Sequence, residues 1–274
     1  MRDALPFPMP ISERITFLYF ERCLLERDGN SLIVLSGQDR IQIPIGRTSV
    51  LMLGPGVSVS HAAISLCALE GALIIWVGEA GVRFYASANP RSNANAILQQ
   101  ASLRLDESKR LAAAKRIYRL MFDEAPPERR SIDQLRGLEG SKVKAMFKVL
   151  ANQHGLQWEG RKQSMDDPLN AAISTATSAL YGVTEAAILA LGYSPAIGMI
   201  HSGDPRSFVF DVADTLKFKT VVPLAFGLVK ESNNRIEQRT RAACREYFYK
   251  NQIPGRLVSI IEEVMNANGT DRPT

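Results

Sequence analysis

The pattern of apolar residues changes near residue 90, and this change restricts the folds that the chain can adopt. Upstream, short segments rich in β-branched and aromatic residues are separated by turn formers, among them DGN at 28–30 and GPG at 54–56. Downstream, apolar residues recur with the period of a helix. The sequence therefore predicts an α+β fold, with an N-terminal β-sandwich-like domain containing one short helix (1–88), a linker (89–95) and a C-terminal all-α domain (96–274).

The expected elements follow from these patterns. In the first part we expect a short helix capped by Ser60, at 61–69, and strands at 15–26, 31–36, 40–45, 49–53, 72–77 and 81–86. In the second part we expect a loop at 152–169 and helices at 96–121, 131–151, 170–191, 205–218, 235–250 and 257–267. The helix at 170–191 is rich in Ala, Ser and Thr. Because small side chains let other helices approach closely, we expect it at the centre of a bundle.

Composition indicates the setting in which the chain works. Apolar residues make up 46% and charged residues 22% of its 274 residues, values typical of a folded chain with a sizeable core. The three cysteines are widely scattered and odd in number, which favours a reducing compartment. The opening segment MRDALPFPMP lacks the apolar run of a secretory signal, and the most apolar later run, 186–200, is too short to span a bilayer. We therefore expect a cytoplasmic protein that does not enter a membrane.

Candidate catalytic or metal-binding side chains lie close together in one stretch, residues 196–226, with the sequence AIGMIHSGDPRSFVFDVADTLKFKTVVPLAF. It contains His201, one of three histidines, and a helical pattern with Asp211 and Asp214. At about 100° per residue the two aspartates share the side of the helix opposite its apolar stripe. Phe208 and Phe210 flank them, so the helix is apolar nearly all round and is expected to pack inside the protein. A carboxylate there needs a cation, a hydrogen-bond donor or a metal ion.

A third acidic side chain, Glu139, faces the predicted core from another helix. The sequence SIDQ at 131–134 has the spacing of a capping box and opens the helix predicted at 131–151. Glu139 lies in the middle of the apolar stripe of that helix and is expected to point inward. Gly137 and Gly140 beside it cost roughly 1 kcal/mol each relative to alanine, which is tolerable if another group approaches the backbone closely.

Together, Glu139, His201 and one or both aspartates supply oxygen and imidazole ligands from separate helical segments. Such a set suits Mg²⁺ or Mn²⁺. Zinc is less favoured, because no cysteine accompanies the cluster. Two structural alternatives stay open: the aspartates are hydrogen-bonded residues of a helix face, or Glu139 pairs with a buried lysine or arginine.

The charge of the chain permits nucleic-acid binding without requiring it. The net charge is +5 and the pI is near 9.2. Basic residues crowd two predicted helices, at Arg104, Lys109, Arg110, Lys115, Arg116 and Arg119 in one and at Arg235, Arg239, Arg241 and Arg245 in the other. Each cluster is equally explained as a solvated helix face balanced by acidic residues.

Long segments around these residues resemble a known family. LRGLEGSKVKAMF surrounds Glu139, SALYGVTEAAILALGYSPAIGMIHSG contains His201, and SFVFDVADTLKFKTVVPLAF contains both aspartates. With GPGVSVSHAAISL and WVGEAGVRFYAS in the β domain, and with the order of the domains, they look like the CRISPR-associated spacer integrase, the first Cas protein, of subtype I-E. The resemblance covers nearly the whole chain.

The resemblance implies roles for particular residues. The metal ligands of the family fall on Glu139, His201 and Asp214, and Asp211 matches a second aspartate that supports activity from beside the metal. We hypothesise that Asp211 holds a water molecule or the attacking hydroxyl by a hydrogen bond. Positions implicated in DNA contact fall on Arg83, Arg241 and Arg245.

The chain departs from the best-known type I-E members in three places. The loop at 158–170 is shorter and lacks the aromatic residues that stack on the branched ends of the DNA substrate. Asp204 stands where a basic residue occurs, and few residues follow the last helix. These differences leave open how the DNA ends are held and which motif is selected, but they do not touch the chemistry.

The resemblance further implies a metal-dependent endonuclease and integrase of CRISPR adaptation, an antiviral defence. A 3′-hydroxyl would attack a phosphodiester and insert short foreign DNA into a repeat array. The implied partners are double-stranded protospacer and repeat DNA, a second copy of the chain in a homodimer, and the small ferredoxin-like second Cas protein, whose dimer is flanked by two such homodimers. The residues alone leave two alternatives: a general metal-dependent nuclease or phosphodiesterase without strand joining, and a metal-free DNA-binding scaffold whose carboxylates pair with arginines.

Overall fold

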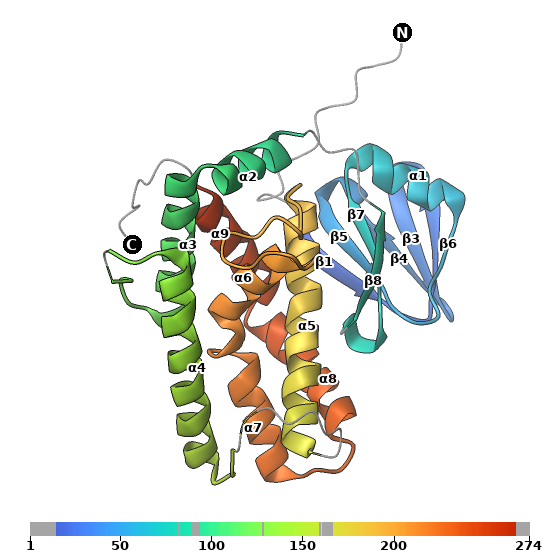
Figure 1. The fold of residues 1–274 in the computed structure, drawn as a ribbon. Coiled ribbons are helices and arrows are strands. Elements are labelled where there is room, and N and C mark those ends of the chain that lie inside the picture. Colours follow the sequence, from blue (N-terminus) through green and yellow to red (C-terminus); the bar gives the residue numbers. More distant parts are fainter. Residues whose placement is uncertain are drawn as a thin grey trace.

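The computed structural model describes residues 15–81, 83–88, 94–127, 129–158, 160 and 167–266. Most of the predicted linker (89–93) and part of the predicted loop (159 and 161–166) lie outside the described residues. A strand-rich N-terminal region is followed by a helical C-terminal region, as the sequence predicts (Figure 1). No helix among the described residues has both the length and the apolar character needed to cross a bilayer.

The strands form two four-stranded sheets. The first has the order β1-β5-β7-β8, with β1 (Ile15–Phe20), β5 (Thr48–Leu53), β7 (Leu73–Val77) and β8 (Phe84–Ala88). The second has the order β4-β3-β2-β6, with β4 (Asp39–Ile43), β3 (Ser31–Ser36), β2 (Leu24–Asp28) and β6 (Ser58–Val59). In the first sheet β1, β5 and β7 run parallel and β8 runs antiparallel. In the second, β4, β3 and β2 are antiparallel and β6 lies parallel to β2.

The first sheet is covered on both faces, and this position explains the continuous apolar run of β5. Successive side chains of a strand point to opposite faces. Val50 and Met52 therefore pack toward α5 (Pro168–Ala190), whereas Leu51 and Leu53 pack toward the second sheet and α1 (His61–Glu70). The first sheet thus connects the strand-rich region to the helices.

The single strand predicted at 15–26 is wrong, because this segment forms β1 in one sheet and β2 in the other. The chain turns between them at Arg22, which adopts a left-handed conformation with φ of 52°. Its backbone N–H donates to the carbonyl of Pro55 at 3.0 Å, and Gly54 N–H donates to Phe20 at 2.8 Å. Apolar periodicity runs through this turn, so the sequence pattern does not reveal the change of sheet.

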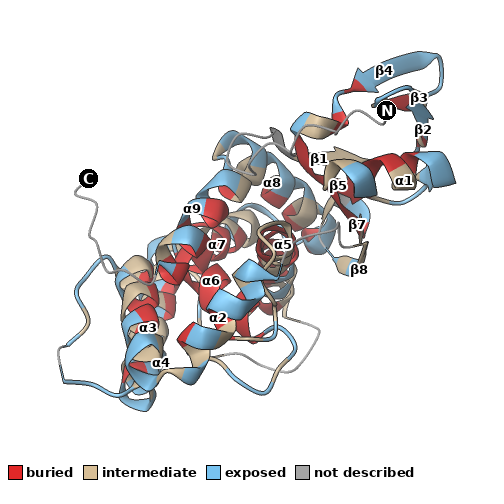
Figure 2. Ribbon diagram, turned by 90° about the horizontal axis from the view of Figure 1, so that it is seen from above, coloured by how far each residue is buried: buried red, intermediate tan, exposed pale blue. Residues whose placement is uncertain are grey.

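The helical region is built around α5. The other helices are α2 (Asn95–Leu105), α3 (Glu107–Phe122), α4 (Ile132–His154), α6 (Ser207–Lys217), α7 (Val221–Glu231), α8 (Ile236–Lys250) and α9 (Ile253–Met265). Helix α5 contacts α6, α7, α8 and α9 as well as β5 and β7, which confirms its predicted central place. Buried residues lie mainly where the helices face one another (Figure 2).

The sequence patterns missed the division between α2 and α3 and the whole of α7. The helix predicted at 96–121 is in fact α2 and α3, separated at Asp106, whose side chain caps α3 by accepting from Ser108 N–H and Lys109 N–H at 3.0 Å each. Helix α7 was not expected; it begins after the non-helical residue Thr220, and Pro223 lies in its first turn.

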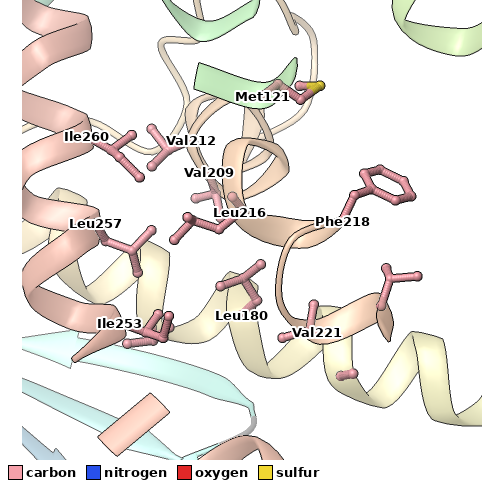
Figure 3. Packing of buried hydrophobic residues seen from close by; sticks show 14 of the residues in the cluster. Met121, Leu180, Val209, Val212, Leu216, Phe218, Val221, Ile253, Leu257 and Ile260 are labelled. Carbon is pink, nitrogen blue, oxygen red and sulfur yellow. The ribbon is translucent and has the colours of Figure 1, made fainter. Parts of the chain in front are cut away.

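Helix α6 is buried, as predicted. Val209, Val212 and Leu216 are at most 3% exposed. They pack in one cluster with Leu180 of α5 and Leu257 of α9 (Figure 3). Burying each such side chain contributes about 1.5–3 kcal/mol. This packing fixes α6 against α5 and α9, and it therefore also fixes the positions of Asp211 and Asp214.

Candidate active site

Asp211 fastens the segment before His201 to α6. Its side chain is fully buried. Oδ2 accepts hydrogen bonds from the backbone N–H groups of Met199 at 2.5 Å and Ile200 at 3.0 Å, and Oδ1 accepts from the N–H of His201 at 2.9 Å. Hydrogen bonds to an ionised carboxylate are about twice as strong as neutral ones. Three successive backbone groups are thereby held by one side chain.

The same carboxylate orients the imidazole. His201 Nδ1 lies 2.7 Å from Asp211 Oδ1. A carboxylate only accepts, so Nδ1 carries the hydrogen and Nε2 keeps its lone pair in the neutral ring. This hydrogen bond raises the pKa of His201. Since both oxygens of Asp211 are engaged, its contacts favour a positioning role over the hydrogen bond to a water or attacking hydroxyl that we expected.

The segment before His201 is also held from α2 and α3. Gln100 is fully buried; its Nε2 donates to the carbonyls of Ser194 and Ile197 at 2.9 Å each, and its Oε1 accepts from Ser194 N–H at 2.7 Å. Arg110 Nε donates to the carbonyl of Met199 at 2.8 Å. Neither side chain was expected to serve the site, because their partners are far away in the sequence.

Close backbone approach occurs in this segment and not in α4. A Cβ at Gly198 would lie 2.5 Å from the carbonyl oxygen of His201 and 2.9 Å from the carbonyl carbon of Ser207. A Cβ at Gly137 or Gly140 would meet nothing within 4 Å. No other part of the described chain approaches Gly137 or Gly140, whereas Gly198 lets the segment lie against the start of α6.

Glu139 reaches the site from α4. Ser131 and Gln134 form the predicted capping box at the start of this helix. Burial raises the pKa of Glu139, the negative charge of Asp214 raises it further, and His201 and Lys217 oppose the shift. Glu139 therefore lies within electrostatic reach of Asp214, His201 and Lys217. Among the described residues, none forms a hydrogen bond or an ion pair with the Glu139 carboxylate.

Asp214 is engaged by a lysine of its own helix. Its Oδ1 lies 2.9 Å from Lys217 Nζ, and each of the two side chains is 10% exposed. We did not single out Lys217 from the sequence, although the spacing of three residues from an aspartate on a helix is a recognised signal for such a pair. Both predicted aspartates thus have partners, and the two partners differ in kind.

The chemistry of the donors fits a hard divalent ion. Glu139 and Asp214 supply carboxylate oxygens and His201 supplies Nε2, a set that suits Mg²⁺ or Mn²⁺. Within the described part of the chain, no three His, Cys, Asp or Glu side chains are already arranged as a ligand set. Lys217 already neutralises Asp214 through Oδ1, so an ion that approaches this carboxylate meets an ammonium beside it.

Metal affinity should weaken on acidification at a higher pH than for ordinary Glu and His ligands. A cation requires ionised Glu139 and unprotonated His201 Nε2. The pKa of each is raised, by burial at Glu139 and by the hydrogen bond to Asp211 at His201, so protons compete at higher pH. We expect Mn²⁺ affinity to decline with a midpoint above about pH 6.5, the ordinary histidine value. Mn²⁺ titrations followed by electron paramagnetic resonance check this, and a midpoint below about 6 would contradict it.

The predicted DNA-contact arginines lie in two places, the hairpin that joins β7 to β8 and helix α8. Arg83 is exposed just before β8, and Arg245 is exposed on α8. Arg241, one helical turn before Arg245, is partly buried, and its Nε lies 3.7 Å from a carboxylate oxygen of Glu79 in the short helix η3 (Glu79–Gly81). The ion pair joins α8 to the hairpin that carries Arg83.

The other basic cluster is used partly inside the protein. Arg116 donates to the carbonyl of Val264 at 2.7 Å, and Arg119 pairs with Glu263 at 2.8 Å. These contacts, like that of Arg110, fasten α3 to other parts of the helical region. A solvated helix face therefore does not account for the whole cluster.

The fold and the site define a class: an α+β protein in whose helical part Glu, His and Asp side chains lie within electrostatic reach of one another. The family model described as "CRISPR associated protein Cas1" matches residues 17–125 and 121–245. The chain belongs to the Cas1 family.

Curated relatives and a solved structure agree with this membership. The CRISPR-associated endonuclease Cas1 of Geobacter sulfurreducens is 47% identical over 275 residues, covering 97% of this chain and 90% of the relative. That of Escherichia coli K12 is 43% identical over 273 residues, with the same coverage of 97% and 90%. The crystal structure of the TtCas1–DNA complex superposes with a TM-score of 0.85 at 34% identity, covering 94% of this chain and 99% of that chain.

Proposed function

We propose that this chain is a metal-dependent DNA endonuclease and integrase of CRISPR spacer acquisition. It inserts short foreign DNA into a repeat array by attack of a 3′-hydroxyl on a phosphodiester. One observation carries the proposal: Glu139, His201 and Asp214 lie within electrostatic reach of one another in a chain whose relatives are CRISPR-associated endonucleases.

The residues of the chain prepare the site for phosphoryl chemistry. In-line attack builds negative charge on the phosphoryl oxygens and on the leaving 3′-oxygen. A divalent ion, when bound, polarises the phosphate and stabilises these oxygens. Asp211 holds His201 in the tautomer that leaves Nε2 as a ligand atom, and α4 presents Glu139 from a half-buried position. No covalent nucleophile is needed, and the three cysteines are buried away from solvent.

The finer assignments are part of the same proposal. We assign Mg²⁺ or Mn²⁺ as the ion, double-stranded protospacer and repeat DNA as substrates, a homodimer as the working unit, the small second Cas protein as partner, and I-E as the subtype. The relative TtCas1 was crystallised with DNA, which supports a DNA substrate for this chain too. The cytoplasmic location remains a prediction from the sequence.

A joining assay tests the proposal. The protein is incubated with Mn²⁺, a labelled oligonucleotide with a 3′-hydroxyl and a supercoiled plasmid. We expect label to become covalently attached to plasmid DNA. An oligonucleotide with a 3′-dideoxy end is the control and should not be joined. Nicking without joining would instead indicate a general nuclease, and DNA binding without any metal-dependent reaction would indicate a scaffold.

The exposed arginines should contribute charge to DNA binding. Arg83→Ala and Arg245→Ala are each expected to weaken duplex binding for all sequences and to reduce the slope of log affinity against log salt by about 1. Fluorescence anisotropy at several salt concentrations measures the slope. Arg119→Ala is the matched control, since this exposed arginine pairs with Glu263 and its slope should stay unchanged. An unchanged slope for Arg83→Ala and Arg245→Ala would contradict the assignment.

A further inference from the structure

Helix α6 carries a cation at the site as well as carboxylates. Lys217 lies one helical turn after Asp214, and its ammonium is 2.9 Å from Asp214 Oδ1. Lys217 is only 8% exposed as a whole residue. Its Nζ also lies 5.5 Å from the ring centroid of Phe218 and 5.9 Å from that of Tyr181. Aromatic faces and a carboxylate together stabilise an ammonium that has lost most of its water.

The position of this ammonium matters because the neighbouring carboxylates repel each other. The charge of Asp214 disfavours ionised Glu139, and the charge of Lys217 favours it. The carboxylate oxygen that Lys217 contacts belongs to a residue required as a metal ligand. A dication bound to that carboxylate would lie close to the ammonium in a poorly hydrated place, where like charges repel strongly.

We propose that Lys217 is the internal counter-ion of the site and that its ammonium competes with the divalent ion for Asp214. An ion that binds Asp214 must then displace the ammonium from Oδ1 or bind Oδ2 against its charge. In the metal-free protein the lysine therefore neutralises part of the negative charge of the carboxylates. The same interaction lowers the affinity of the protein for the divalent ion. This inference rests on the proposed function, because it takes Asp214 as a metal ligand.

Mn²⁺ affinity of the full chain without DNA tests the competition. Lys217→Met keeps most of the side-chain length and removes the charge. We expect it to bind Mn²⁺ about tenfold or more tightly than the unchanged protein, a factor that corresponds to about 1.4 kcal/mol. The affinity is measured from the loss of the paramagnetic resonance signal of free Mn²⁺ at about pH 8, above the ordinary histidine pKa. Lys217→Arg retains a cation and should not tighten binding.

Lys219→Met is the matched control. This lysine lies two residues further on and donates to the carbonyl of Leu120 at 2.8 Å and to Asp123 at 2.6 Å, so its loss should leave Mn²⁺ affinity unchanged. Equal or weaker Mn²⁺ binding by Lys217→Met overturns the inference. If that variant does not fold, as judged by circular dichroism, Lys217→Gln replaces it with the same expected tightening and the same overturning result.

Two further variants separate this inference from the function on which it rests. Glu139→Gln and His201→Asn should each weaken Mn²⁺ binding at least about tenfold, as expected for the loss of a ligand. If these two variants weaken Mn²⁺ binding while Lys217→Met leaves it unchanged, the results support the metal site and contradict the competition by Lys217. If neither of them changes Mn²⁺ affinity, the proposed metal site itself fails.

Discussion

Replacing Asp211 with asparagine is expected to lower the free energy of unfolding by about 3–5 kcal/mol and to abolish strand joining. The fully buried carboxylate accepts from three successive N–H groups and from the ring of His201. An amide has one oxygen to offer, and its NH₂ group would face other donors. Part of the backbone before His201 is then left without an acceptor, and the imidazole loses the partner that selects its tautomer.

Urea denaturation measures the loss of stability, and the joining assay measures the loss of function. Asp214→Asn is the matched control on the same helix. It should abolish joining with a smaller change in the free energy of unfolding, because the amide oxygen can still accept from Lys217 Nζ and no backbone N–H group loses its acceptor. Equal destabilisation by the two substitutions would contradict the distinct roles that the contacts assign to these aspartates.

Replacing Glu139 with glutamine is expected to lower the joining rate by at least about a thousandfold, equivalent to about 4 kcal/mol of transition-state stabilisation. The amide keeps the shape of the side chain and removes the charge that a divalent ion requires. The free energy of unfolding should stay unchanged or rise by up to about 1 kcal/mol. The raised pKa of Glu139 means that the folded protein disfavours its ionised form, so neutralisation does not destabilise the fold.

Single-turnover joining kinetics at saturating Mn²⁺, together with thermal melting, check this prediction. Binding of the DNA duplex should stay within about threefold of the unchanged protein, since phosphate contacts by Lys and Arg supply most of the affinity. Glu124→Gln is a suitable control, because this exposed glutamate pairs with Lys142 and should not affect joining. Retained joining in Glu139→Gln would remove Glu139 from the site.

Local sequence patterns determined some features of both parts of the chain and missed others. The capping box of Ser131 and Gln134, the cap at Ser60 and the buried stripe of α6 were all predicted and confirmed. These features depend on residues within a few positions of one another. The division at Arg22 and the cap at Asp106 were missed, because apolar periodicity continues across the first and helical periodicity across the second.

By itself the sequence determined that Glu139 points inward from α4 and that Asp211 and Asp214 share one side of a buried helix, since helical periodicity dictates both. Only the tertiary structure decided that Asp211 holds the backbone before His201. Asp211 meets backbone groups 10 to 12 residues earlier in the chain, and Gln100 holds the same segment across 94 residues. Such partners are selected by the packing of α2, α3 and α6, which no local pattern encodes. The two aspartates are chemically identical, and they differ because folding gives one of them N–H groups and the other an ammonium.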